Sequence, residues 1–539
     1  MNMKRVFVFL VALTIAFSLV PLQQAQALSS DTKMFISADN TFYAYIKAGE
    51  TISASFLRVN QDEPFDTPRE DITITIDGPS AEQQTCVAPK DVPIGQGCTF
   101  APQTAQKTGI WRVQFEVPAT AKSYQEVSPD VQWGKNLFSW NIAVRSGTEE
   151  QKGRIWTERY SIRQPAAISY TTNFIYYYIS EDGYIYRASY KGFNGQISTL
   201  SADGVGLRKA KTCESAYRSA DVADVKFTPA LGSCGSAYKL FFEEPTGSLP
   251  TKAETWDGKE AWVRPDINKP VISELHFSPD ETTDQQSGAI SFYLRNFIGQ
   301  YEIKVDVEGD GNFDGQDDVT IRQQMKQLTS GLQKVTFDGT DKVGRILPRD
   351  QKIGVKVVIT KVAEIHLVAA DVEGRTGGLE LIRLSGENAP TTGLCWNDNE
   401  LSPMAIDLMP KKLDGQDCAD STGGVHAWSY ADQSWGNARY IDDWVYAQAS
   451  LEGNNQIIYP NEDGEAAAAT QNSMVPIVVA SVAVVVLLGA VTVVILVRRR
   501  SKNQGQPQLP PQYNYLPPTQ PTDNSNTYDG TPPSDQSQR

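Results

Sequence analysis

Short runs in which apolar and polar residues alternate are the dominant pattern of this 539-residue chain. Examples are ITITI at 72–76, GIWRVQFEV at 109–117, FSWNIAV at 138–144 and KIGVKVVIT at 352–360, and the breaks between runs contain Gly, Pro, Asn or Asp. A period of two places one row of side chains in a core and the other in solvent, as in an antiparallel strand. The sequence therefore predicts an all-β protein of tandem antiparallel β-sandwiches, which we expect to be immunoglobulin-like.

One aromatic stretch, FIYYYISEDGYIYRASY, predicts a β-hairpin. Asp182-Gly183 lies between its two halves, and glycine readily takes the positive φ of a tight turn. Its tyrosines would suit a sugar-stacking platform, but aromatic residues on both faces indicate a strand buried on two sides. We therefore interpret Tyr176, Tyr178, Tyr184 and Tyr186 as packing residues.

The N-terminus has the features of a secretory signal peptide, residues 1–27. Lys4 and Arg5 precede an apolar run from Val6 to Val20, and Ala25-Gln26-Ala27 suits a signal peptidase. An uncleaved anchor is the alternative, although the apolar run is short for a membrane span.

Near the C-terminus, Met474–Val497 is uncharged and predicts a single transmembrane helix. As a helix it is about 36 Å long, enough for a hydrocarbon layer of about 30 Å. Arg498, Arg499 and Arg500 follow directly, so this end is expected to be cytoplasmic and the protein to be a single-pass plasma-membrane protein. The tail, 498–539, is predicted to be disordered, and Pro510-Pro511-Gln512-Tyr513 is a possible ligand for a cytoplasmic proline-binding partner.

The remaining chain divides, on composition and turn signals, into four parts and a linker. We predict a β-sandwich at 29–165, a β-rich domain at 166–268, an immunoglobulin-like domain at 269–385, a β-rich terminal segment at 386–460 and a linker at 461–473. About 450 residues suit three or four domains.

All six cysteines fall in the predicted extracellular part, as three neighbouring couples. Fifteen connectivities are formally possible, and we expect the nearest-neighbour one, in which each disulfide contributes about 3 kcal/mol. Zinc binding is the alternative, but the sequence contains no CxxC motif and has only three histidines. The predicted pairs are Cys86 with Cys98, Cys213 with Cys234, and Cys395 with Cys418.

The charge of the chain argues against nucleic-acid binding. The whole chain has a net charge of −15. The signal segment, with two basic residues, contributes +2, and the tail, with five basic and three acidic residues, also contributes +2. Residues 28–473 therefore carry a net charge of −19. Such a surface repels nucleic acid and attracts cations. The same region has no Asn-x-Ser/Thr sequon, which favours a bacterial source.

The stretch KVDVEGDGNFDGQDDVTI, residues 304–321, holds six acids in eighteen positions. Counted from Asp306, it has the spacing of a twelve-residue calcium loop, with Gly311 at the sharp turn. The flanking YEIKVDV and DVTI indicate strands, so the loop is not an EF-hand. The predicted ligands are Asp306, Glu308, Asp310, the carbonyl of Asn312, Asp314 and Asp317.

The twelfth position of this loop is Asp rather than the longer Glu, so we expect either a lower affinity or assistance from Asp318. A calcium ion would have a structural role there, with a Kd on the order of 10⁻⁴ to 10⁻³ M. The alternative is a solvated acidic hairpin that binds nothing.

The stretch FDGTDKVGRILPRDQKIGVKVVI, residues 337–359, resembles the WDGxDxxGxxVPxGxY stretch of the immunoglobulin-like module of flagellar hook-capping proteins and many bacterial surface proteins. Asp338-Gly339 and Gly344 match its turns and Pro348 leads into its last strand, whereas Phe337 replaces a Trp and Arg349-Asp350 replace the x-Gly step. The resemblance implies a fold and an extracellular setting, not an activity. WGNARYIDDWVYA, 435–447, is similar to segments of large repetitive bacterial surface proteins.

The sequence contains no HExxH, GxSxG, Walker or Rossmann motif. His276 and His366 alternate with apolar residues, so we interpret both as ordinary strand positions. Two alternatives stay open, because distant residues could assemble either site: a catalytic triad, or a pair of carboxylates that cleaves glycosides.

The resulting hypothesis is a membrane-anchored, extracellular binding or adhesion stalk of a bacterial surface, with an extracellular protein or glycan as ligand. The alternatives are a cell-envelope hydrolase acting on surface polysaccharide, and a receptor whose tail recruits a cytoplasmic partner.

Overall fold

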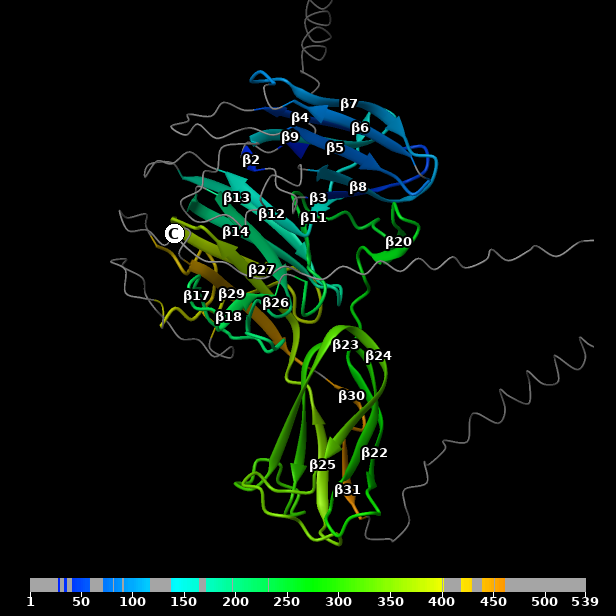
Figure 1. The fold of residues 1–539 in the computed structure, drawn as a ribbon, viewed down its shortest axis with the longest axis vertical. Coiled ribbons are helices and arrows are strands. Elements are labelled where there is room, and N and C mark those ends of the chain that lie inside the picture. The colour runs from blue at the N-terminus through cyan, green and yellow to red at the C-terminus, as the bar shows by residue number, and fades with distance from the viewer. Residues whose placement is uncertain are drawn as a thin grey trace, which may run out of the picture. The chain divides into compact units, whose positions relative to one another are not determined.

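The computed structural model describes residues 28–29, 33–35, 41–58, 71–80, 82–89, 92–116, 137–163, 171–195, 197–230, 232–399, 401, 418–428, 439–449 and 451–460. Every regular element within these ranges is a β-strand. The four alternating runs form β5 (Ile72–Asp77), β8 (Gly109–Glu116), β9 (Leu137–Ser146) and β25 (Ile353–Val358). The predicted all-β class is confirmed (Figure 1).

The largest sheet has eleven strands, all paired antiparallel. In strand β4 (Thr51–Arg58), which pairs with a neighbour on each side, Ile52, Ala54 and Phe56 are buried and the residues between them are half-buried, as period-two alternation requires. Its path is β17 (Ala220–Asp221), β29 (Arg439–Gln448), β26 (Lys361–Ala370), β15 (Ile197–Asp203), β12 (Arg159–Arg163), β2 (Lys33–Phe35), β9, β4 (Thr51–Arg58) and β7 (Gly97–Thr104), with β1 (Leu28–Ser29) and β10 (Glu149–Glu150) on β9.

A second antiparallel sheet has ten strands. Its path is β28 (Thr391–Thr392), β27 (Gly374–Arg383), β14 (Ile185–Asn194), β13 (Thr172–Ile179), β19 (Lys239–Phe241), β11 (Ile155–Thr157), β3 (Thr41–Ile46), β8, β5 and β6 (Gln83–Ala88). There are also two small two-stranded sheets, β16 (Leu207–Lys209) with β18 (Phe227–Pro229) and β20 (Lys252–Glu254) with β21 (Glu260–Trp262).

The two large sheets share one hydrophobic core. Phe42 of β3 and Trp140 of β9 have ring centroids 4.7 Å apart, and Tyr160 of β12 and Tyr176 of β13 are 5.8 Å apart. Since each pair joins one sheet to the other, the sheets form the two layers of a continuous sandwich.

The predicted hairpin at Asp182-Gly183 is confirmed. β13 and β14 pair antiparallel across it, and Gly183 has a φ of +90°. Tyr176, Tyr178 and Tyr186 are buried and Tyr184 is half-buried, so these rings pack inside the fold as interpreted.

A six-stranded sheet with a core of its own forms a separate module. It contains β22 (Val271–Pro279), β23 (Gly288–Asp306), β24 (Val319–Phe337), β25, β30 (Glu452–Gly453) and β31 (Gln456–Tyr459). β30 runs parallel to β22 and β31 antiparallel to β25, so a segment near the C-terminus completes a sheet that begins at Val271.

Glycines form the two turns of the module's FDG stretch as predicted. Gly339 and Gly344 have φ values of +78° and +84°. A Cβ on Gly339 would lie 2.8 Å from the Ser287 nitrogen, so this position also requires the absence of a side chain.

The sheets do not follow the predicted division of the chain. β12 of the predicted 29–165 domain pairs with β15 of 166–268, and β14 of 166–268 pairs with β27 of 269–385. The segment 386–460 is divided, because β29 joins the eleven-stranded sheet and β30 and β31 join the module. Alternation identifies a strand but not its pairing partner, which explains the difference.

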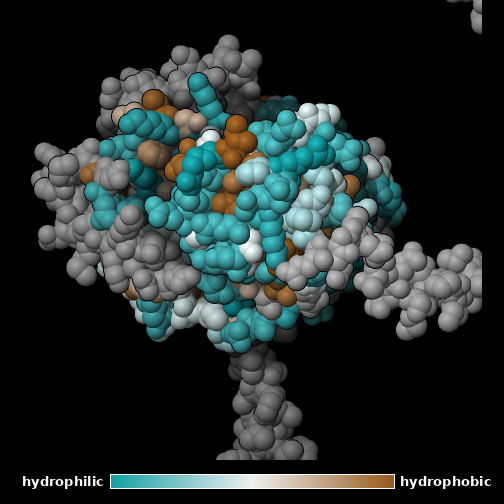
Figure 2. Space-filling model, turned by 90° about the horizontal axis from the view of Figure 1, so that it is seen from below, coloured by the Kyte–Doolittle hydropathy of each residue, from teal (hydrophilic) through white to brown (hydrophobic). Residues whose placement is uncertain are grey.

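The predicted signal peptide (1–27), linker (461–473), membrane helix (474–497) and tail (498–539) lie outside the described residues. In the part of the chain that the structure describes, there is no helix long and apolar enough to cross a membrane. The face in Figure 2 is mostly hydrophilic, with hydrophobic side chains in small separate areas.

Candidate functional site

The predicted calcium loop connects β23 to β24, and its first carboxylate is 1% exposed. Oδ1 of Asp306 accepts hydrogen bonds from the amides of Glu308 (3.1 Å) and Gly309 (2.7 Å), and Oδ2 accepts one from Gly311 (2.7 Å). Gly311 has a φ of +88°, which matches its predicted place at the sharp turn. Asp306 therefore orders the first half of the loop.

Asp318 orders the other end. Its carboxylate is 7% exposed and accepts hydrogen bonds from the amides of Val307 (3.1 Å) and Gly315 (2.6 Å). Asp310 accepts the amide of Asn312 at 2.8 Å. The two buried acids thus close the loop with backbone amides as partners.

Two cations offset part of the loop's charge. Lys304 pairs with Asp314, and Arg345 pairs with both Asp317 and Asp341. Hydrogen bonding to Lys304 lowers the pKa of Asp314. Repulsion among the six acids is therefore reduced by neighbouring basic side chains.

The donor set of the loop offers only a partial fit to calcium. Within the ranges that the structure describes, no three or more His, Cys, Asp or Glu side chains are grouped so as to hold a metal ion. Glu308, Asp310 and Asp314 are exposed, and their oxygens are hard donors of the type calcium prefers. Calcium binding by this loop stays a prediction.

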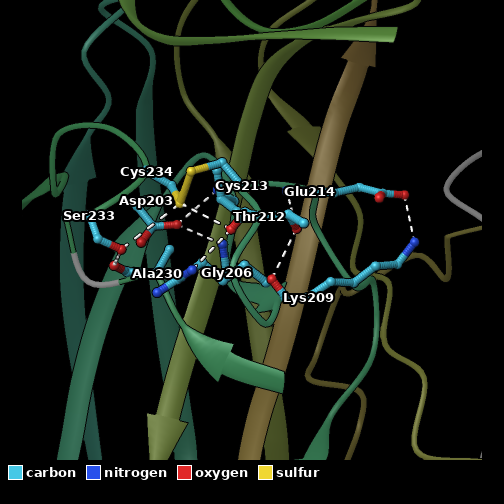
Figure 3. Close-up of a disulfide and its surroundings, with 11 residues drawn as sticks. Asp203, Gly206, Lys209, Thr212, Cys213, Glu214, Ala230, Ser233 and Cys234 are labelled. Carbon is cyan, nitrogen blue, oxygen red and sulfur yellow. Dashed lines mark hydrogen bonds and ion pairs between the residues drawn. A yellow bond between two sulfur atoms is a disulfide. The ribbon is translucent and has the colours of Figure 1, made fainter. Parts of the chain in front are cut away.

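The three predicted disulfides are confirmed, and no cysteine is free. Cys86 lies on β6 and Cys98 on β7, the terminal strands of the two large sheets, so this bond joins the two layers at one edge. Cys213–Cys234 ties together the segment that carries β16 and β18 (Figure 3). The third bond joins Cys395 to Cys418.

A buried group of charges is the feature that sequence reasoning missed. His366 of β26 and Asp442 of β29 are both 0% exposed, with Nδ1 2.9 Å from Oδ1. Nε2 of His366 lies 3.6 Å from Glu364, which also accepts the Tyr217 hydroxyl at 2.6 Å. Burial opposes the charge of the imidazole, but Asp442 and Glu364 raise the pKa of His366 to about 10. His366 is therefore a buried cation, not an ordinary strand residue.

Asp443, which follows Asp442 in β29, contacts two basic side chains. Its Oδ2 lies 2.8 Å from Nη1 of Arg375, and its Oδ1 lies 2.6 Å from Nδ1 of His426. Nε2 of His426 in turn lies 2.6 Å from Oδ2 of Asp398. Trp396 stacks on the His426 ring at 4.9 Å. Burial opposes the charge of His426, yet the two carboxylates raise its pKa.

These contacts engage three of the four ring nitrogens of the two buried histidines. Both nitrogens of His426 lie 2.6 Å from carboxylates, so this ring has no nitrogen to accept a proton from a serine. Nδ1 of His366 faces Asp442, whereas its Nε2, 3.6 Å from Glu364, is beyond hydrogen-bond distance. His276 is exposed on β22. The sequence signal was available in YIDDW, where adjacent acids inside an apolar strand require buried partners on both faces.

A cavity of about 230 Å³ lies between β11, β12 and β15. Its polar lining includes Tyr43, Thr157, Glu158, Arg159, Ser201 and Asp203. Asp203 is 6% exposed, and burial raises its pKa. No motif marks this cavity, because its residues come from four separate parts of the chain.

Comparison with known proteins gives little to add to this geometry. No protein-family model and no curated protein matches the chain. Among solved structures, it is matched with the crystal structure of a tetra-tandem repeat in the extending region of a large adhesion protein, at 11% identity and a TM-score of 0.12. That match covers 78% of this chain and 100% of the other. A TM-score this low supports no conclusion about fold or function.

Proposed function

We propose that the protein is an extracellular binding or adhesion protein of a bacterial surface, anchored in the plasma membrane by Met474–Val497. The observation that carries the proposal is the set of three disulfides in an all-β chain without a free cysteine. Disulfides form and persist in oxidising compartments, and the sandwich architecture is common among cell-surface binding domains.

Two features of the sequence support the surface location. The N-terminal segment has the parts of a signal peptide, and the FDGTD stretch resembles an immunoglobulin-like module of bacterial surface proteins. The Pro-rich tail, 501–539, would lie in the cytoplasm, where its PPQY segment offers a ligand to a proline-binding partner.

The direct test labels intact producing cells with a membrane-impermeant amine reagent. We expect labelled lysines within residues 28–473 and unlabelled Lys502. Attachment of the cells to immobilised matrix proteins and glycans is then measured with and without the gene, and deletion of 501–539 should leave attachment intact. Attachment that is unchanged without the gene would reject the proposal.

A hydrolase acting on surface polysaccharide is the second candidate, because Glu158 and Asp203 line one cavity. Burial raises the pKa of Asp203, as a general acid requires. Incubation of the purified protein with surface polysaccharide separates the two functions: saturable binding without new reducing ends supports adhesion, and turnover supports the hydrolase.

A further inference from the structure

The cavity beside Glu158 exists because the chain changes sheets at that residue. β11 ends at Thr157 in the ten-stranded sheet, and β12 begins at Arg159 in the eleven-stranded sheet. The Thr157 hydroxyl lies 2.7 Å from the carbonyl oxygens of both Thr41 and Arg159, which fixes the crossing. The opening between the two layers at this point is therefore part of the scaffold.

Asp203, one of the two acids that line the cavity, is held in place by the backbone. Oδ1 of Asp203 accepts hydrogen bonds from the amides of Val205 (2.8 Å) and Gly206 (2.6 Å) (Figure 3). None of the hydrogen bonds between described residues uses Oδ2 of Asp203. This carboxylate is thus a fixed acceptor with one oxygen uncommitted, and a fixed group loses little entropy when a ligand binds.

Tyr43 adds a rigid aromatic wall. Its ring stacks on Trp156 at 5.9 Å and lies 5.5 Å from Trp256, so two neighbouring indole rings restrict its movement. Its hydroxyl has no hydrogen-bond partner among the described residues. Burial, and then the Glu158 carboxylate, raise the pKa of Tyr43, so the phenol stays a neutral donor.

The lining favours a neutral ligand that carries several hydroxyl groups. Glu158 and Asp203 disfavour an anion, whereas Arg159 beside them disfavours a small cation. A hydroxyl group satisfies both kinds of partner, because it donates to a carboxylate and accepts from a guanidinium or a phenol.

The cavity is large enough for one sugar ring. Its volume is about 230 Å³, and it is lined on several sides by polar residues that a single hexose could contact. We propose that this cavity binds a single sugar unit of an external glycan, an inference that rests on the proposed binding function.

The test uses the purified full-length protein and the methyl glycosides of glucose, galactose, mannose and N-acetylglucosamine. Calorimetric titration should give saturable binding of at least one glycoside. Glu158→Gln and Tyr43→Phe each remove one polar partner and should each weaken that binding by about tenfold. Melting temperatures of the variants show whether they are folded. Glu158→Gln removes the partner of buried Lys239 and could therefore unfold the protein; in that case Tyr43→Phe alone tests the site.

Two matched controls lie outside the cavity. Glu260, whose side chain is 65% exposed, and Tyr293, which is 40% exposed, are changed in Glu260→Gln and Tyr293→Phe. Both controls should bind the glycoside as the wild type does. Equal loss of binding in controls and cavity variants would contradict the assignment.

Three results would overturn the proposal: no binding of any of the four glycosides, binding that is unchanged in both cavity variants, or hydrolysis of the bound glycoside. Failure of the sugar assignment is distinguishable from failure of the proposed function. If cells that carry Glu158→Gln and Tyr43→Phe still attach through the protein, the adhesion function stands and the cavity is not its ligand site.

Discussion

The Asp442 carboxylate lies 2.9 Å from Nδ1 of His366, and neither side chain is exposed to solvent. Asp442 also accepts the amide of Leu207 at 3.0 Å, so the pair fixes the small β16–β18 sheet to β26 and β29. Removing one partner of a buried ion pair leaves an uncompensated charge and typically costs about 3–5 kcal/mol. This pair is therefore a sensitive probe of how the sandwich is held together.

Gly206→Ala should destabilise the protein through this pair. A Cβ at Gly206 would lie 2.4 Å from Nδ1 of His366 and 2.5 Å from Oδ2 of Asp442. Gly258→Ala is the matched control, because Gly258 has a similar positive φ, +78° against +69°, and nothing within 4 Å. We expect Gly206→Ala to lower the free energy of unfolding by about 2 kcal/mol more than Gly258→Ala. Equal losses in denaturant melts would show that backbone strain alone is responsible.

Stability should fall as the pH rises above neutrality. The folded pKa of His366 is raised from 6.5 to about 10, so the stabilisation is complete below about pH 6.5 and is lost as the pH approaches 10. The raised pKa of His426 likewise makes the protein less stable as the pH rises. Burial lowers the pKa of Lys239, which has the opposite effect on the pH dependence of stability. His366→Gln should flatten the decline in unfolding free energy between about pH 7 and pH 10. A variant with the wild-type slope would contradict a charged His366.

Deletion of residues 451–460 should loosen the module without unfolding the two large sheets. β31 is the strand next to β25, and Tyr459 packs on Phe277 with ring centroids 5.1 Å apart. Hydrogen exchange should become faster at β25, which loses its neighbour, while β4 and β8 keep their protection. Deletion of 501–539 is the control and should change neither. Unchanged exchange at β25 would show that the C-terminal strands do not belong to the sheet.

Calcium binding is tested by melting the protein in calcium and in EDTA. A bound ion stabilises the folded state by mass action, so the melting temperature should be higher in calcium. Asp310→Ala should abolish that difference. In EDTA it should lower the melting temperature only slightly, because the Asp310 carboxylate accepts one local hydrogen bond, from the amide of Asn312. Asp280→Ala, in another exposed turn of the module, should leave the difference intact. Identical melting temperatures in calcium and EDTA for the wild type would argue against the predicted site.

The local features of this fold were predictable and the long-range ones were not. Alternation identified β5, β8 and β25, Asp182-Gly183 identified a hairpin, and short spacing identified the disulfide partners. Sheet order was not predictable, because a strand with one buried face accepts many partners. The return of Gln456–Tyr459 to β25 is an example, since nearly a hundred residues separate the two strands.

The candidate sites also differ in how far the sequence could predict them. The acidic loop is contiguous, so its residues could be named from the sequence, and both flanking strands are present. Asp442 and Asp443 could have been suspected of burial, but their partners His366, Arg375 and His426 come from other elements. The cavity beside Glu158 depends on the chain crossing between the sheets at that residue and has no local sequence pattern.

The central claim is that residues 28–473 fold in an oxidising, extracellular setting, and counting thiols tests it most directly. Protein from its native cells is denatured with an alkylating reagent and no reductant, then digested and examined by mass spectrometry. The account predicts no alkylated cysteine and three linked peptide pairs, Cys86–Cys98, Cys213–Cys234 and Cys395–Cys418. Six alkylated cysteines would contradict it.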